Sequence, residues 1–173
     1  NNFGNLLNRT ISMMKKYFDG VIPTPAPAGD EDSDLTNKSK EVIGDVRKLY
    51  DELAYNKILQ KIWELVDTTN QYIDKAGPWN LVKTDEGKER LKTVMYNAAE
   101  SLRVLGVLLY PFMPESTTSL MKQLGVETSI EEQGMKSIDE WGGLKPGSQT
   151  QKAKQLFPRI EDKQAEKILA ELS

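Results

Sequence analysis

Apolar side chains recur at helical spacing along most of the chain. Residues three and four apart lie on the same side of a helix, so the pattern predicts amphipathic helices that each bury one face. Five helices are expected, over residues 3–18, 36–53, 55–76, 84–110 and 114–124. Thr36 is the expected N-cap of the second helix, while Gly77 followed by Pro78 should end the third.

Two stretches lack this periodicity. Residues 19–35 are rich in proline, glycine and acidic residues, which predicts a solvated loop. After residue 125 the chain is rich in Gly, Lys and Pro, with a short helical piece expected at 151–156 and an amphipathic terminal helix at 162–172.

No stretch alternates as a β-strand does, so the predicted fold class is all-α. We expect a helical bundle of four to five helices in residues 1–125. Residues 126–173 should form an irregular C-terminal arm and a terminal helix, which pack on the bundle as part of the same domain.

Composition limits the chemistry that the chain can perform. The 173 residues are 38% hydrophobic and 28% charged, which is typical of one globular domain. Cysteine and histidine are absent, which excludes disulfides, Cys/His zinc sites and the commonest general base. The net charge of −3 gives no overall attraction to nucleic acid, so a polyanion would need a local basic patch. Because the chain begins inside a predicted helix and not with Met, we expect it to be a piece of a longer protein.

The first predicted helix carries a polar strip among its leucines and methionines. At about 100° per residue, one side of it holds Asn5, Asn8, Arg9 and Ser12, and Lys15 and Lys16 continue the strip with positive charge. Carboxamide and guanidinium groups offer paired donors and acceptors in fixed planes, which suits the reading of a base edge. The same strip is also compatible with an ordinary solvated helix face.

The tryptophans differ in their predicted settings. Trp79 follows Pro78 at a helix end, where its indole can either stack on an unpaired base or plug the end of the core. Trp63 lies inside the apolar stripe of the third helix and is expected in the core. Trp141 is expected to anchor the arm.

Other candidate sites are weaker. A basic cluster follows Trp79, at Lys83, Lys88, Arg90 and Lys92, but interleaved acids favour a mixed-charge helix start over a phosphate site. Acid pairs such as Asp51 and Glu52 are interpreted as surface charges. No phosphate-binding glycine motif occurs between a strand and a helix. The residues alone therefore leave open a nucleic-acid-binding module, a helical protein-interaction bundle without RNA binding, and a carboxylate-dependent enzyme.

Four stretches resemble, in the same order, the C-terminal helical part of methionyl-tRNA synthetase. They read FGNLLNRTISMMKKYFDGVIP, IWELVDTTNQYIDKAGPWNLVK, LGVLLYPFMPESTTSLMKQLG and WGGLKPG…QLFPRIE. The resemblance covers essentially the whole chain, and the ordered set of motifs is specific although each is short. In that family this region is the anticodon-binding domain, a helical bundle that follows the class I catalytic domain.

The resemblance implies functional roles for particular residues. Asn5 and Arg9 would recognise the anticodon of tRNA(Met), chiefly its first base, a cytosine, and Trp79 would stack on the anticodon bases. Supporting RNA contacts are expected from Asn8, Ser12, Pro78 and Lys83. The family motif reads APW, whereas this chain has Gly77 in place of Ala, a change that should alter the helix end without removing the stacking surface.

The resemblance also places the chemistry outside this chain. No catalytic, cofactor-binding or metal-binding residue is expected here, and ATP and zinc would belong to the catalytic part of methionine–tRNA ligase. The expected partners are the tRNA(Met) anticodon loop and the protein's own catalytic domain, with no membrane. The expected location is cytoplasmic.

Overall fold

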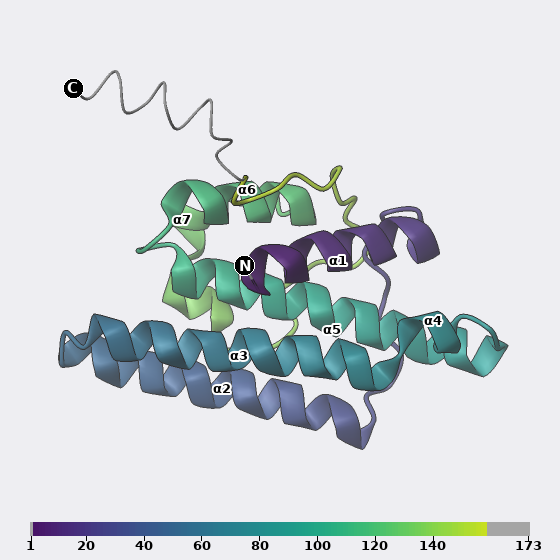
Figure 1. Ribbon diagram of the computed structural model, residues 1–173, viewed down its shortest axis with the longest axis horizontal. Helices are drawn as coiled ribbons and strands as arrows, with labels where there is room; N and C mark the ends of the chain where they lie inside the picture. The colour runs from purple at the N-terminus through teal and green to yellow at the C-terminus, as the bar shows by residue number, and fades with distance from the viewer. Residues whose placement is uncertain (1, 159–173) are drawn as a thin grey trace.

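The computed structural model describes residues 2–158, which are helical apart from the connecting segments and the irregular residues 139–158. The long helices are α1 (Asn2–Phe18), α2 (Asp30–Asp51), α3 (Tyr55–Ala76), α5 (Asp85–Leu109) and α6 (Pro114–Leu124) (Figure 1). Short helices complete the described part: α4 (Pro78–Leu81), α7 (Ile130–Gln133) and the 3₁₀ helix η1 (Met135–Ile138). The predicted all-α bundle is confirmed.

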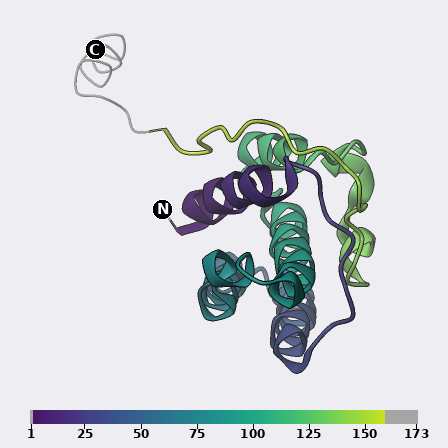
Figure 2. The same ribbon diagram turned by 90° about the vertical axis from the view of Figure 1, so that its right-hand side faces the viewer.

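Helix α5 forms the centre of the bundle. Helices α1, α2, α3 and α6 all pack against it (Figures 1 and 2). Every residue from Thr93 to Leu109 is consequently buried, including polar ones. A helix that is covered on all sides loses the one-sided pattern of a surface helix, and residues 104–109 are accordingly all apolar or glycine.

The predicted start of α2 is wrong. The helix begins at Asp30, six residues before Thr36, so the acidic half of the expected loop is helical. The Gly29 amide donates to Asp32 Oδ2 at 2.7 Å, and the negative side chains of the first turn interact favourably with the helix dipole. The acidic residues at 30–32 therefore favour the beginning of α2 and do not indicate a loop.

Two further predictions need correction, and a third falls on residues that the structure does not describe. Residues 151–156 contain no helix, and instead run alongside α6. Trp63 is 37% exposed and is not a core residue. It lies one turn before Asp67, which accepts a hydrogen bond from Asn2 at the start of α1, so α1 begins beyond Trp63. The predicted terminal helix at 162–172 lies outside the described residues.

The arm, defined from here on as residues 139–158, is fixed to the bundle by buried polar contacts. The Glu100 carboxylate on α5 accepts hydrogen bonds from the backbone amides of Gly142, Gly143 and Leu144 at 2.8–2.9 Å. Trp141 Nε1 donates to Asn97 Oδ1 at 3.2 Å, so this indole does anchor the arm.

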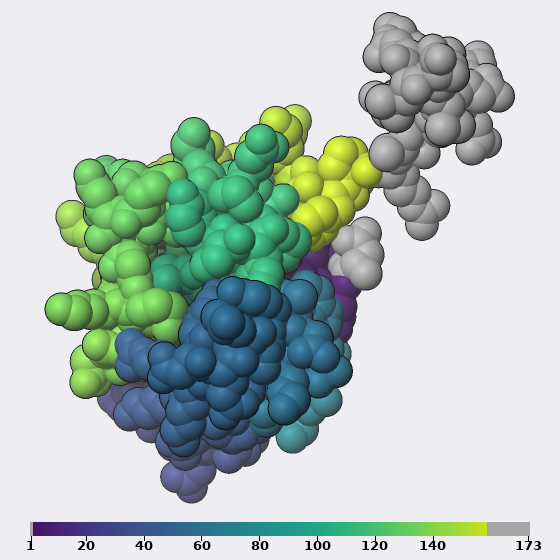
Figure 3. All heavy atoms as spheres, turned by 90° about the vertical axis from the view of Figure 1, so that its left-hand side faces the viewer, coloured from purple at the N-terminus to yellow at the C-terminus, as the bar shows by residue number. Residues whose placement is uncertain are grey.

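The turn between α2 and α3 closes one end of the molecule (Figure 3, blue). Leu53 and Tyr55 are 67% and 51% exposed there. The Tyr55 ring packs edge-on against the Phe112 ring, with 6.4 Å between the ring centres. Tyr55 is the first residue of α3, and Trp79 follows shortly after its last residue, Ala76. The exposed rings of Tyr55 and Trp79 are therefore separated by the full length of this 22-residue helix. None of the helices within residues 2–158 combines the length and apolarity that crossing a membrane requires.

Candidate nucleic-acid interface

The local sequence at the end of α3 turns Trp79 outward. Gly77 caps the helix in the left-handed conformation, with φ of 56°, which glycine adopts at little cost. Pro78 is buried and starts the four-residue helix α4. Trp79 then follows on the outer side, and its side chain is 47% exposed. The indole is therefore a surface platform and not a plug of the core.

Arg9 on α1 meets this platform. Its guanidinium carbon lies 5.9 Å from the centre of the Trp79 ring, within the range of a cation–π interaction. The same guanidinium forms an ion pair of 2.5 Å with Asp74, in the last turn of α3. Arg9 is one-third exposed and Asp74 is 61% exposed, so the pair lies at the surface. The structure thus brings together two predicted residues that are distant in the chain.

The other polar residues of α1 extend this surface. Asn5 and Ser12 are exposed, and Asn8 is half-buried. Asn5 precedes Arg9 by one helical turn, so their side chains are neighbours on the helix surface. The opposite face of α1 is packed into the core by Phe3, Leu6, Leu7, Thr10, Ile11 and Met14.

Asp74 is the site residue that the sequence reasoning missed. A carboxylate in the last turn of a helix opposes the helix dipole, which makes the position unfavourable unless a cation is nearby. The position of Asp74 in the last turn of a predicted helix was therefore the sequence feature that could have indicated a nearby cation. Here the cation is Arg9, whose charge Asp74 partly neutralises and whose position it restrains.

The basic residues after Trp79 do not form a phosphate site. Lys88 pairs with Asp85 at 2.9 Å and Lys92 with Glu89 at 2.7 Å, as expected of a mixed-charge helix start. Lys83 is exposed and donates to Asn80 Oδ1 at 2.8 Å, close to Trp79 in sequence. Of this group, Lys83 is the residue beside the candidate interface.

Arg90 instead belongs to a buried polar network. It pairs with Asp32, which is 1% exposed and also accepts hydrogen bonds from Tyr72 and Asn97. Burial by itself raises the pKa of Asp32, but the hydrogen bonds from Tyr72, Gly29 and Arg90 outweigh it and hold the pKa below its ordinary value. Burial, together with the neighbouring carboxylate, raises the pKa of Tyr72. The carboxylate is saturated with protein donors, so the network holds α2, α3 and α5 together.

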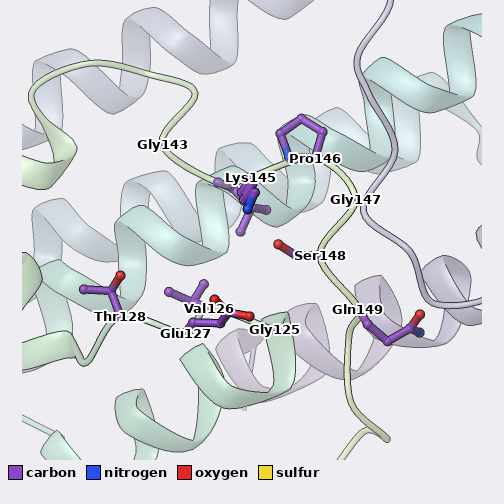
Figure 4. Close-up of a pocket in the computed structure, with 11 residues that line it drawn as sticks. Gly125, Val126, Glu127, Thr128, Gly143, Lys145, Pro146, Gly147, Ser148 and Gln149 are labelled. Carbon is purple, nitrogen blue, oxygen red and sulfur yellow. The ribbon is translucent and has the colours of Figure 1, made fainter.

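A separate cavity of about 520 Å³ lies between the loop that follows α6 and the arm (Figure 4). The segment Gly125 to Thr128 forms one side, and residues 143–149 form the other. Its charged lining residues are Glu127 and Lys145. Since Arg9 and Trp79 do not line it, the candidate interface is an open surface and not this cavity.

Comparison with known proteins places the chain in a family. The family profile described as "Anticodon binding domain of methionyl tRNA ligase" matches residues 22–173. Methionine–tRNA ligase of Caldanaerobacter subterraneus is 41% identical over 99% of the chain and 26% of its own length. The Bacillus subtilis ligase is 40% identical over 93% of the chain and 24% of its own length. The chain spans about a quarter of the length of these relatives.

The structural comparison agrees. The structure of Mycobacterium tuberculosis methionyl-tRNA synthetase in complex with methionyl-adenylate matches with a TM-score of 0.84 and 29% identity, over 92% of this chain and 31% of that one. The apo form of the same enzyme gives a TM-score of 0.85. Sequence, fold and relatives together show that the chain belongs to the family of methionyl-tRNA ligase anticodon-binding domains.

Proposed function

We propose that the surface formed by Asn5, Arg9 and Trp79 recognises the first anticodon base of tRNA(Met), an unpaired cytosine. The observation that carries the proposal is the position of the Arg9 guanidinium, 5.9 Å from the ring of the exposed Trp79. A stacking platform and a planar donor group then address the same base, one through its face and the other through its edge.

The recognition chemistry follows from these groups. Stacking of a base on an aromatic side chain contributes about 1–3 kcal/mol. Cytosine presents a ring nitrogen and a carbonyl as acceptors and an amino group as donor; Arg9 donates to the acceptors, and Asn5 can donate or accept. Uracil replaces the amino donor with an acceptor, so a paired set of hydrogen bonds discriminates by about 1–3 kcal/mol.

The remaining roles concern the surroundings of this surface. Asn8, Ser12 and Lys83 provide supporting RNA contacts, and Pro78, which is buried, acts by orienting Trp79. In the longer protein, a catalytic domain outside this chain ligates methionine to the bound tRNA with ATP. The anticodon-binding part itself requires no cofactor.

The test measures binding of a fluorescently labelled hairpin with a CAU loop by anisotropy at low salt. Trp79→Ala should weaken binding by about 5- to 150-fold, the equivalent of the stacking energy. Its stability loss should stay below about 1 kcal/mol, because the side chain is half exposed. Trp63→Ala is the matched control, since Trp63 is also exposed but lies in the first half of α3, away from Trp79 on α4.

Arg9→Gln separates base recognition from general attraction. Loss of the guanidinium should reduce the preference for CAU over UAU loops, whereas an equal loss for both loops would mean that Arg9 contacts only phosphate. Absence of saturable binding by the unaltered chain would favour a helical protein-interaction bundle.

A further inference from the structure

A groove of about 600 Å³ runs between α1 and the arm, on the other flank of the polar strip from Arg9. Its lining consists of Ile11, Ser12 and Lys15 from α1 and residues 149–153 from the arm. The arm follows this side of α1 in both ribbon views (Figures 1 and 2). The groove is therefore adjacent to the proposed recognition surface but distinct from it.

The lining is positively charged in a chain whose net charge is −3. Lys15 and Lys152 contribute positive charge, and the lining residues include no carboxylate. Glutamine and serine side chains supply hydrogen-bonding groups beside them, and Ile11 and Ala153 supply an apolar surface. A sugar–phosphate strand offers the complementary groups: phosphate charges, hydroxyls and the apolar face of the ribose.

The arm side of the groove is held in place from both ends. The Thr150 amide and hydroxyl both donate to the Gly20 carbonyl, at 2.8 and 2.7 Å. The Gln123 side chain on α6 accepts from the Lys154 amide at 2.7 Å and donates to its carbonyl at 3.1 Å. Because Lys152 lies between these two attachments, its backbone is positioned before any ligand arrives.

Distances along α1 connect the groove to the recognition surface. A helix rises 1.5 Å per residue, so Lys15 lies about 9 Å along the axis from Arg9. Ser12 lies between them, and it belongs both to the polar strip and to the groove lining. A strand that leaves the Trp79 platform and crosses the exposed side of α1 therefore reaches the groove within a few nucleotides.

We propose that this groove binds the sugar–phosphate backbone of the RNA strand whose unpaired base occupies the Arg9–Trp79 surface. Lys15 and Lys152 each neutralise one phosphate, and the contacts carry no base specificity. The inference rests on the proposed function, because it takes the strand bound at Trp79 as the occupant.

The first experiment measures the salt dependence of hairpin binding by the Lys15→Gln/Lys152→Gln double variant. Each phosphate contact to a single strand contributes about 0.7 to the slope of log affinity against log salt, so the slope should fall by about 1.4. Affinity should fall by the same factor for CAU and UAU loops. Lys40→Gln/Lys48→Gln, two exposed lysines on α2, is the control and should leave the slope unchanged.

The second experiment locates the phosphates with hairpins that carry one uncharged methylphosphonate linkage each. Linkages next to the CAU bases should weaken binding to the unaltered chain, and the same linkages should no longer matter for the lysine double variant. An unchanged slope, or a loss equal to that of the α2 control, would overturn the groove assignment.

The two proposals fail in different ways. If Trp79→Ala weakens loop binding but the lysine double variant behaves as the unaltered chain, the recognition surface stands and the groove falls. If the lysine variant lowers the slope but Trp79→Ala and Arg9→Gln change nothing, the groove binds RNA and the base-recognition proposal falls. If the unaltered chain binds no hairpin, both fall.

Discussion

Replacement of Glu100 by Gln tests how the arm is attached to the bundle. The Glu100 carboxylate is fully buried and accepts bonds on both oxygens. Oε1 accepts from Gly142, Gly143 and Arg103 Nη2, and Oε2 accepts from Leu144 and Arg103 Nε, all at 2.7–2.9 Å. In Glu100→Gln one of these oxygens becomes an amide nitrogen that faces N–H donors.

The magnitude follows from the better of the two amide orientations. With the nitrogen in place of Oε2, the Leu144 amide and Arg103 Nε lose their acceptor. Hydrogen bonds to charged groups contribute about 1.5–3 kcal/mol each, so two cost about 3–6 kcal/mol. Breaking a buried ion pair typically costs about 3–5 kcal/mol, and Arg103 is itself almost fully buried. We therefore expect the free energy of unfolding to fall by about 3–5 kcal/mol.

The assay combines urea denaturation, followed by far-UV circular dichroism, with amide hydrogen exchange. The exchange of Gly142, Gly143 and Leu144 should accelerate, because their acceptor is weakened. Glu89→Gln is the control: Glu89 forms a surface pair with Lys92, so its loss should cost less than about 1 kcal/mol. A loss below 1 kcal/mol for Glu100→Gln, or unchanged exchange of the arm amides, would refute the reasoning.

Two further changes test the C-terminal end of α3 and the buried network around Asp32. Gly77→Ala should lower the free energy of unfolding by about 1–2 kcal/mol, because φ is 56° there, and a denaturation midpoint equal to that of the unaltered chain would contradict this. Asp32→Asn should cost about 1.5–3 kcal/mol at neutral pH, the contribution of a hydrogen bond to a charged group, because the ionised form accepts from Arg90 and Tyr72. Since folding lowers the pKa of Asp32, this contribution is present above pH 4 and is lost as the pH falls through the folded pKa. The difference between the two proteins should therefore narrow below about pH 4 in acid titrations followed by circular dichroism, and a constant difference would argue against an ionised Asp32.

The sequence predicted the long helices well where local signals agree. The bounds of α3 and α6 match those expected from periodicity, with Gly77 and Gly125 as left-handed caps. The prediction failed at α2, where Asp32 looked like part of a solvated acidic loop. Its burial depends on Tyr72, Arg90 and Asn97, which belong to later helices, so no local pattern could reveal it.

At the candidate interface, too, the sequence predicted part of the arrangement and tertiary packing decided the rest. That Asn5, Arg9 and Ser12 share one face of α1 follows from helical periodicity, and that Trp79 leaves the helix follows from Gly77 and Pro78. The residues that face this polar strip of α1 were decided by tertiary packing. Helices α1 and α3 both pack on α5, and this packing brings Arg9 into contact with Asp74 and Trp79. The exposure of Trp63 was decided in the same way, because α1 begins against Asp67 of α3, one turn after Trp63.

The sequence by itself therefore determined the helices, their buried faces and the residue types available for recognition, because these depend on interactions within a few turns of chain. The tertiary structure alone decided which of those faces meet, which charges are paired, and that the arm and α1 enclose a basic groove. These properties depend on contacts between residues far apart in the chain, and such contacts exist only once the helices have packed.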